Sequence, residues 1–360
     1  MVNFEDLSFK RISVHTILKK DPDEEFANVL LNMNLVIIDE SASEIIKRRL
    51  NDAAHKTAKA FELYISDTLE SGFFGYSREF PINADSEFVR SSGKIAQLLA
   101  NATKSSAISG GYLILIDGYT SSGHQVAVVI KAELHEAFVL NGNSLNILRN
   151  IFLSPTQRFL KFGVIFERRA DQIEEKHVEM GYPNDQYGCL LYDDQFRTDS
   201  IAAEYFFKDF LGFSTEFNPK IQTKRFYEAT QKYIANSFET NERKMDLATA
   251  LNSSMKNTNE LEFSPKEFAM SYFTNEEMIE NYANEIAIHL PENIEKDITL
   301  INRKLNSKKL SFPNHIVLSG PESAFEDNVI IINDNEELKN LNVSQDSYTI
   351  VKVKGKPFRV

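Results

Sequence analysis

Apolar residues recur along this chain at two periods, and the changes between these periods outline its elements. Residues 9–18 alternate at a period of two, which predicts a strand. Over 43–69, apolar residues recur at steps of three and four, which predicts an amphipathic helix; a second helix is predicted over 86–103. Short apolar runs then predict strands over 112–117, 125–132, 136–141, 159–167 and 187–193. Because most of these runs lie close together, mostly antiparallel pairing is expected.

The second half of the chain changes to a mainly helical pattern between 198 and about 310. Pro219 stands where a helix would begin, and Ser264–Glu267 is a capping box with proline at the first helical position. The last 50 residues return to short strands, over 315–319, 328–332 and 348–354. This order predicts an α+β protein of two lobes. We expect an N-terminal domain over 1–195, with helices and an antiparallel sheet, and a mainly helical C-terminal domain over 196–360 that ends in a small sheet.

Composition narrows the class of protein. The formal net charge is −12, which argues against coating of DNA by bulk charge, so any contact with nucleic acid must come from local basic patches or through another protein. Cys189 is the only cysteine, which excludes an intramolecular disulfide framework and a cysteine metal cluster, and its apolar surroundings predict a buried thiol. The longest apolar runs are far below the roughly 20 residues that a membrane helix needs, and no secretory signal is visible. The cytoplasm is the expected location.

Catalytic motifs are weak in this sequence. Gly118–His124 follows an apolar strand but has no lysine and no following helix, so a hairpin turn is expected there in place of a phosphate-binding loop. His15 lies on an apolar alternation and is expected to be a packed residue. A metal-dependent nuclease remains an alternative, with Asp117, Glu133 and His124 as its candidate residues. No catalytic residue, cofactor or metal ligand is assigned.

Basic residues gather in three places within this acidic chain. Two stretches, Thr299–His315 and Ser347–Val360, contain no Asp or Glu, and a third group lies at the start of the helix expected after Pro219. Such stretches are also typical of a solvated helix end or an exposed strand edge. Read as phosphate contacts, the candidates are Lys220, Lys224, Arg225, Arg303, Lys304, Lys308, Lys309, Lys352, Lys354 and Lys356.

Aromatic residues are concentrated between Phe196 and Phe238, where they make up eleven of 43 residues. The pattern predicts a helix, a loop at Gly212 and a second helix. A helix that is apolar nearly all round is usually buried, so core packing or a subunit interface explains most of these rings. The second possibility makes this segment a candidate surface for a homodimer or another protein.

The residue order of four segments resembles the bacterial 37-kDa nucleoid-associated protein family. These segments are ISVHTILKKD (12–21), GGYLILIDG (110–118), EYFFKDFLGFSTEFNPKIQTKRFYEATQKY (204–233) and YTIVKVKGKPFR (348–359). They lie in the same order across nearly the whole chain, whereas 236–345 departs most from the family's pattern. The resemblance implies a cytoplasmic bacterial protein on the nucleoid that associates with DNA and has no established enzyme activity. It does not identify binding residues.

Three functions follow from these observations. The first is a nucleoid-associated protein without evident catalytic activity, which contacts double-stranded DNA weakly through the basic candidates and forms a homo-oligomer. The second is a protein-interaction module that a partner, such as another nucleoid protein, recruits to the nucleoid. The third is the metal-dependent nuclease.

Overall fold

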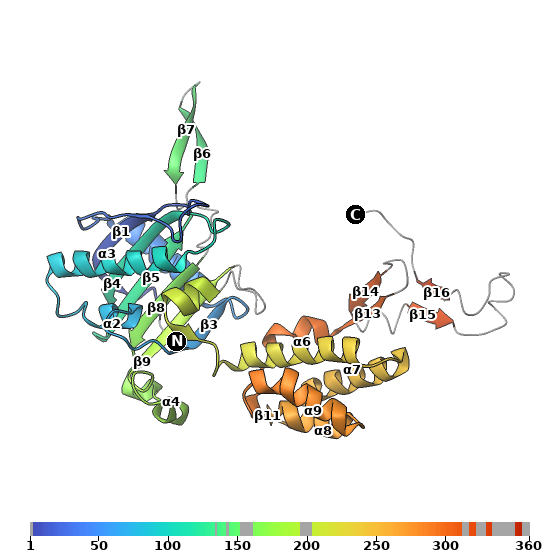
Figure 1. Cartoon of the computed structure of the whole chain (residues 1–360). Helices are drawn as coiled ribbons and strands as arrows, with labels where there is room; N and C mark the ends of the chain where they lie inside the picture. Colours follow the sequence, from blue (N-terminus) through green and yellow to red (C-terminus); the bar gives the residue numbers. More distant parts are fainter. Residues whose placement is uncertain are drawn as a thin grey trace. The chain divides into compact units, whose positions relative to one another are not determined.

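The computed structural model (Figure 1) describes residues 3–133, 135–141, 144–151, 161–194, 204–311, 317–321, 329–332 and 350–354. The chain divides into two compact units, Met1–Arg225 and Phe226–Val360. The observed class is α+β, as expected: an antiparallel sheet with helices, then a helical region followed by short strands. The predicted domain boundary at residue 195 stays a prediction.

An eight-stranded sheet is the centre of the first unit, and its strands run in the order β10-β3-β9-β8-β5-β4-β1-β2. Every pairing in it is antiparallel. Its strands are β1 (Ser8–Ile17), β2 (Val29–Leu30), β3 (Ala60–Ile65), β4 (Gly111–Tyr119), β5 (Gln125–Ala132), β8 (Lys161–Glu167), β9 (Tyr187–Asp193) and β10 (Phe213–Ser214). Five of the predicted strands therefore agree closely with β1, β4, β5, β8 and β9. A separate hairpin is formed by β6 (His135–Asn141) and β7 (Ser144–Ile151).

Both faces of the sheet are covered. Helix α1 (Glu40–Ala54) buries Leu50 and its neighbours in one core with alternate residues of the strands, among them Ile114 and Val128. The opposite face carries α2 (Phe73–Arg78), α3 (Asp85–Ala102) and a π-helical turn, η2 (Tyr205–Phe210). Figure 1 shows α3 lying across this face. Because both faces are covered, the central strand β5 is buried along its whole length.

The predicted helix over 43–69 is wrong in its second half. Helix α1 ends at Ala54, and the chain then enters strand β3, in which Phe61, Leu63 and Ile65 are buried while Glu62 is exposed. The local sequence fits either period over these few residues. Pairing with β9 over four residues decides in favour of the strand, which is a tertiary effect that the periodicity cannot contain.

The first part of the aromatic segment, as far as Phe213, packs onto the sheet of the first unit. The backbone of Gly212 has φ +68°, which ends η2 and favours glycine. Gly163 on β8 leaves room for the Leu211 side chain, because a Cβ atom there would overlap it. Strand β10 then pairs with β3, and α6 (Pro219–Ser237) begins at the proline, as predicted. Within the described part of this segment, only Phe217 is exposed among the phenylalanines.

The second unit has a helical core. It contains the later part of α6 with α7 (Asn241–Lys256), α8 (Pro265–Tyr272), α9 (Glu276–Glu285) and α10 (Asn302–Leu305). Tyr233, Phe273 and Tyr282 meet in it at ring-centroid distances of 5.2–5.8 Å. Pro265 is the first residue of α8, although the Ser264 side chain makes no capping hydrogen bond.

Short strands complete the second unit. They are β11 (Glu262–Phe263) paired with β12 (Ile294–Glu295), β13 (Ser307–Ser311) with β14 (Val317–Pro321), and β15 (Val329–Ile332) with β16 (Ile350–Val353).

Two further short helices, α4 (Glu175–Met180) and η1 (Ala170–Gln172), belong to the first unit. Within the residues described in both units, no helix has the length and apolar character that crossing a membrane requires.

Candidate nucleic-acid interface

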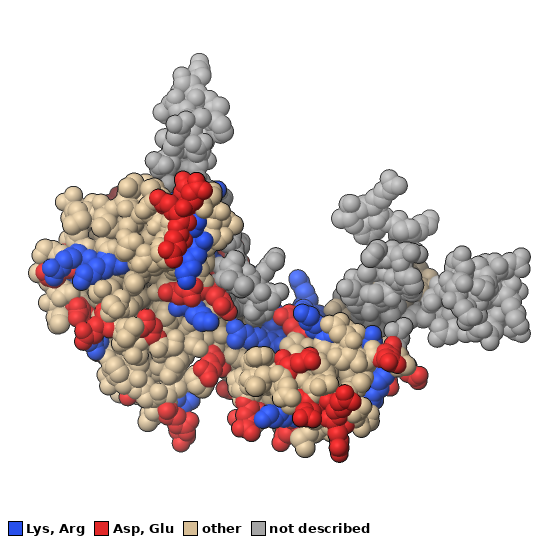
Figure 2. Space-filling view, viewed as in Figure 1, with Lys and Arg blue, Asp and Glu red and all other residues tan. Residues whose placement is uncertain are grey.

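The structure distributes the predicted phosphate contacts over both units. Lys220, Lys224 and Arg225 lie on the first turns of α6 in the first unit. The rest belong to the second unit: Arg303 and Lys304 on α10, Lys308 and Lys309 on β13, Lys352 on β16 and Lys354 just after it. Lys356 lies outside the described residues. Figure 2 shows acidic and basic side chains interspersed over the visible face of the described residues.

The start of α6 is held against strand β3 by hydrogen bonds. The Asn218 side chain accepts from the backbone N–H of Ile221 at 3.1 Å and donates to the carbonyl oxygen of Glu62 at 2.8 Å. It therefore caps the helix and ties it to β3 at once. Two residues later, Lys220 Nζ lies 3.5 Å from the carbonyl oxygen of Thr57. This places the beginning of α6 beside the loop that connects α1 with β3.

That loop, residues 55–59, is itself basic. It contains His55, Lys56 and Lys59 and no acidic residue. The Lys56 amine lies 5.7 Å from the centre of the Tyr192 ring, and the Lys59 carbonyl oxygen accepts from the Asp193 N–H at 3.0 Å. Both contacts are with strand β9 or its end, so the loop has a fixed position. Neither lysine was among the candidates from sequence.

Two adjoining segments of the first unit, loop 55–59 and the first turns of α6, therefore carry four lysines, which we call the α6 patch: Lys56, Lys59, Lys220 and Lys224. All four are half-buried, so their stems pack while their amines can stay near water. Lys224 follows Lys220 by one helical turn and shares its face of α6. In the sequence, the only feature that could have indicated the lysines of this loop is the absence of acidic residues from 53–61.

Arg225 differs from these lysines in its surroundings. Burial lowers the pKa of its guanidinium, and the carboxylate of Glu204 opposes that shift. An arginine that is half-buried and faces an acid is less accessible to a DNA phosphate than its position in sequence indicates. Arg225 remains a candidate, but it lies at the margin of the α6 patch.

The cations of the second unit have different environments. Arg303 is exposed, whereas Lys304 Nζ lies 2.5 Å from Glu228 Oε1. Lys308 and Lys309 stand opposite Gly320 and Ser319 in the β13–β14 pair, and Lys352 stands opposite Ile330 in the β15–β16 pair. Lys352 and Lys354 are exposed. Among the described contacts, none brings β13 and β16 together.

The residues of the predicted nuclease site do not converge. Asp117 is buried and accepts from Arg11 on the neighbouring strand β1, through Nε at 3.0 Å and Nη2 at 2.6 Å. Lys131 precedes the candidate Glu133 by two residues and lies on β5 opposite Leu113. Leu113 is four residues along β4 from Asp117, so Lys131 and Asp117 are separated by about 13 Å at the usual rise of a strand. Glu133 lies beyond Lys131 and accepts a hydrogen bond from Ser109.

Lys131 is buried in a polar row on the face that η2 covers. Its amine donates to the Ser109 carbonyl oxygen at 2.8 Å and to the Tyr205 hydroxyl at 3.0 Å. Burial lowers its pKa to about 8, and the neighbouring Glu133 acts in the opposite direction. Lys161, opposite Lys131 on β8, is 2.5 Å from Asp193. Across the described residues, no three His, Cys, Asp or Glu side chains are placed to hold a metal ion together.

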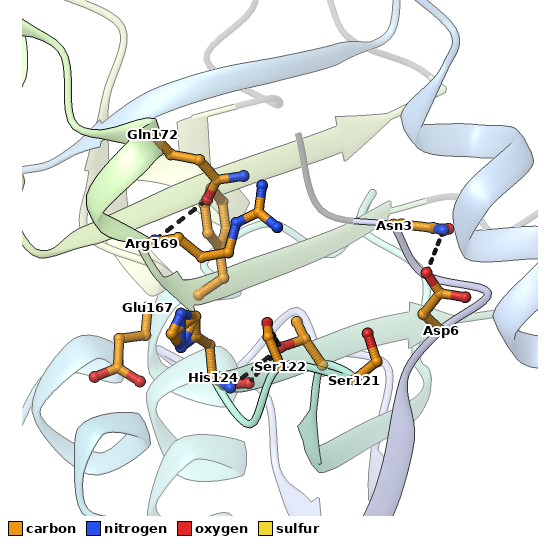
Figure 3. Close-up of a pocket in the computed structure, with 10 residues that line it drawn as sticks. Asn3, Asp6, Ser121, Ser122, His124, Glu167, Arg169 and Gln172 are labelled. Atoms are coloured by element: carbon orange, nitrogen blue, oxygen red, sulfur yellow. Dashed lines mark hydrogen bonds between the residues drawn. The ribbon is translucent and has the colours of Figure 1, made fainter.

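His124 lies instead in a small surface pocket of about 190 Å³ at the β4–β5 turn (Figure 3). The turn is a hairpin, as predicted, in which the Thr120 hydroxyl accepts from the His124 N–H at 3.1 Å. Figure 3 shows His124, Glu167 and Arg169 on one side of the pocket and Asp6 on the other. Since the lining contains Asp6 and Glu167 beside Arg169, the pocket does not select a polyanion.

The sequence as a whole matches one family model. The family is described as nucleoid-associated protein YejK, and the match covers residues 13–350. The chain belongs to this family. No curated protein matches the sequence.

Membership of the YejK family confirms the resemblance that the four segments indicated. The match begins within β1 and ends within β16, so both units are part of the family's sequence pattern. The aromatic segment that resembles the family most is buried for the greater part, with Tyr205, Phe206, Phe207 and Phe210 all in the core. Its residue order therefore marks how this family folds, and the half-buried lysines of the α6 patch are left as the candidates for binding.

Proposed function

We propose that this member of the YejK family binds double-stranded DNA directly and weakly, without catalysing a reaction, and that it is located on the nucleoid in the cytoplasm. The observation that supports direct binding is the contact of Lys220 with Thr57, which puts the start of α6 beside the loop that contains Lys56 and Lys59. A cluster of amines on a surface is suited to phosphates of any sequence, because it contacts the backbone and reads no base edges.

The number of lysines sets the expected salt dependence. If all four contact phosphates, log K should fall with log of the salt concentration at a slope of about −3 to −4. The net charge of −12 adds repulsion from the rest of the molecule, so binding should be measurable mainly at low ionic strength. The candidates of the second unit would add to this slope only if they reach the same duplex.

The test is duplex binding by the full chain, measured across salt concentrations with two duplexes of unrelated sequence. We compare the double variant Lys59→Glu/Lys220→Glu with Lys19→Glu/Lys104→Glu, whose two lysines are exposed in the same unit and outside the patch. Both variants change the net charge by the same amount. The patch variant should lose about tenfold or more in affinity for both duplexes, and its salt slope should be smaller by about 2.

Two results would contradict this proposal. Absence of affinity at the lowest salt concentration would exclude direct binding and favour recruitment through a partner. Equal losses in the two double variants would show that overall charge, and not the α6 patch, determines binding. Circular dichroism of both variants shows whether the fold is retained, and Lys59→Gln/Lys220→Gln gives a milder version of the same change.

A further inference from the structure

An uncharged apolar segment with exposed side chains contains strand β2. Residues 26–38, FANVLLNMNLVII, contain no Asp, Glu, Lys or Arg in a chain that is 26% charged. Four large side chains of this segment are exposed: Leu30 by 58%, Leu31 by 49%, Met33 by 67% and Ile37 by 96%. Single exposed apolar residues are common, but four within eight residues require an explanation. We call these four residues the edge strip.

The segment has a fixed place at the edge of the sheet. It includes β2, which is the last strand on that side of the sheet and pairs with β1 at Thr16 and Ile17. It then continues beside β1, where the Val36 N–H donates to the Ile12 carbonyl oxygen at 2.8 Å. The Asn32 N–H donates to His15 Nδ1 at 3.2 Å. These bonds hold the backbone of the segment against the sheet along its length.

The side chains divide between two directions. Val36 and Ile38 pack against the core that α1 covers. Leu31 reaches α3, where a Cβ atom on Gly93 would lie 3.5 Å from one of its methyl groups, and still remains half exposed. Some apolar residues of the segment thus pack in the core, whereas Met33 and Ile37 face solvent.

We propose that a second copy of this chain packs on the edge strip. An edge of an antiparallel sheet is complementary to a copy of itself turned by a two-fold axis, since the same residues then meet in opposite order. The strip exposes on the order of 500 Å², which is more than half of the roughly 800 Å² that each partner buries in a standard interface.

The absence of charge in the edge strip favours a second copy of the chain over DNA or a strongly charged protein. DNA finds no cation within residues 26–38, and a strongly charged protein finds no counter-charge there. Two copies with a net charge of −12 each repel one another through most of their surfaces. An uncharged strip is the place where they can meet without burying an unpaired charge. The buried aromatic segment 204–238, which the sequence offered as a dimer surface, presents only Phe217 in exposed form among its described phenylalanines.

The test is the mass of the full chain in solution, measured by sedimentation equilibrium up to about 100 µM, a range that detects even weak dimers. Wild-type protein should approach twice the mass of one chain. Met33→Glu/Ile37→Glu should remain monomeric, with an unchanged circular dichroism spectrum, because both residues are exposed. Leu69→Glu/Ile82→Glu, which changes two exposed apolar residues elsewhere, should dimerise as the wild type does.

Salt separates this inference from DNA binding. Added salt screens the repulsion between two acidic chains, so dimerisation should be retained or strengthened at the salt concentrations that abolish DNA binding. The proposal is overturned if the wild-type chain stays monomeric at every concentration and salt level. It is also overturned if Met33→Glu/Ile37→Glu dimerises as well as the control. Neither result bears on the α6 patch, whose test is affinity for duplex DNA.

Discussion

Arg11 and Asp117 form a buried ion pair between strands β1 and β4, where they stand directly opposite one another. Nε and Nη2 of the arginine both donate to Oδ2 of the carboxylate, and Nη1 donates to the carbonyl oxygen of Asn83 at 2.7 Å. The guanidinium also lies 4.7 Å from the centre of the Phe88 ring on α3. The pair thus links the sheet to the helix that covers it.

Removal of the aspartate charge should destabilise the protein strongly. Asp117→Asn leaves the guanidinium buried without its counter-charge, so we expect the free energy of unfolding to fall by about 3–5 kcal/mol. Asp85→Asn is the matched control, because Asp85 also contacts Arg11, at 3.4 Å, but is 70% exposed. Its expected cost is below about 1 kcal/mol. Urea unfolding at neutral pH measures both, and similar losses in the two variants would contradict the importance of burial.

Lys131 should make stability depend on pH on the alkaline side. Its pKa is about 8 in the folded chain, chiefly because burial disfavours the ammonium, against an ordinary value of 10.5. Between these two values the unfolded chain binds more protons than the folded chain, so stability should rise with pH from about 8 towards 10. The gain from this one group is about 2–3 kcal/mol.

The difference between wild type and Lys131→Met isolates that gain from all other titrations. Methionine is an unbranched side chain that is shorter than lysine by one atom, and it removes the ammonium. The difference in unfolding free energy between the two proteins should therefore shift in favour of the wild type as pH rises from 7 to 10. A difference that stays constant over this range would show that the Lys131 amine titrates alike in both states.

His15 should act in the same way on the acidic side. It is buried between Ser13 and Ser92, at 3.1 and 3.0 Å, and burial lowers its pKa to about 4 from 6.5. Below pH 6.5 the unfolded chain takes up a proton that the folded chain does not, so stability should fall as pH drops from 6.5 to 4. In His15→Gln this fall should be smaller by up to about 3 kcal/mol. Thermal unfolding at pH 7 and pH 4.5, with His289→Gln as control, measures the difference.

The limits of prediction from sequence are visible at residues 60–65. Their apolar positions continue the helical pattern of 43–54 and also alternate as in a strand, and the pairing of these residues with β9 and β10 decides between the two. The same error hid half of the α6 patch. Lys56 and Lys59 read as the polar face of a long helix, whereas the contact that brings their loop to Lys220 spans 163 residues of sequence. Strands β5 and β9 were predicted correctly because each is a short, isolated apolar run.

The sequence shows which residues are basic enough to contact phosphate, but it does not show which of them are already paired with an acid in the folded chain. Lys304 and Arg303 are neighbours in an acid-free stretch, and nothing local distinguishes them. The structure places Lys304 2.5 Å from Glu228, which lies 76 residues earlier, and leaves Arg303 exposed. A lysine that pairs with such a distant acid is less able to bind a phosphate. The residues next to the lysine in sequence do not predict this pairing.

Glu228 should therefore restrain DNA binding by the second unit, if the stretch Arg303–Lys309 contacts phosphates. Lys304 must exchange its carboxylate for a phosphate, and a partly exposed pair of this kind contributes about 0.2–1 kcal/mol. Glu228→Gln removes that competition, so it should tighten duplex binding by about two- to fivefold at low salt. Glu267→Gln, at an exposed position on α8, changes the net charge equally and should have a smaller effect. If the Glu228→Gln and Glu267→Gln variants bind duplex DNA with equal affinity, Lys304 makes no contact with DNA. A second variant, Arg303→Ala, tests the rest of the helix. If it also binds as the wild type does, α10 lies outside the interface and the α6 patch is left as the candidate surface.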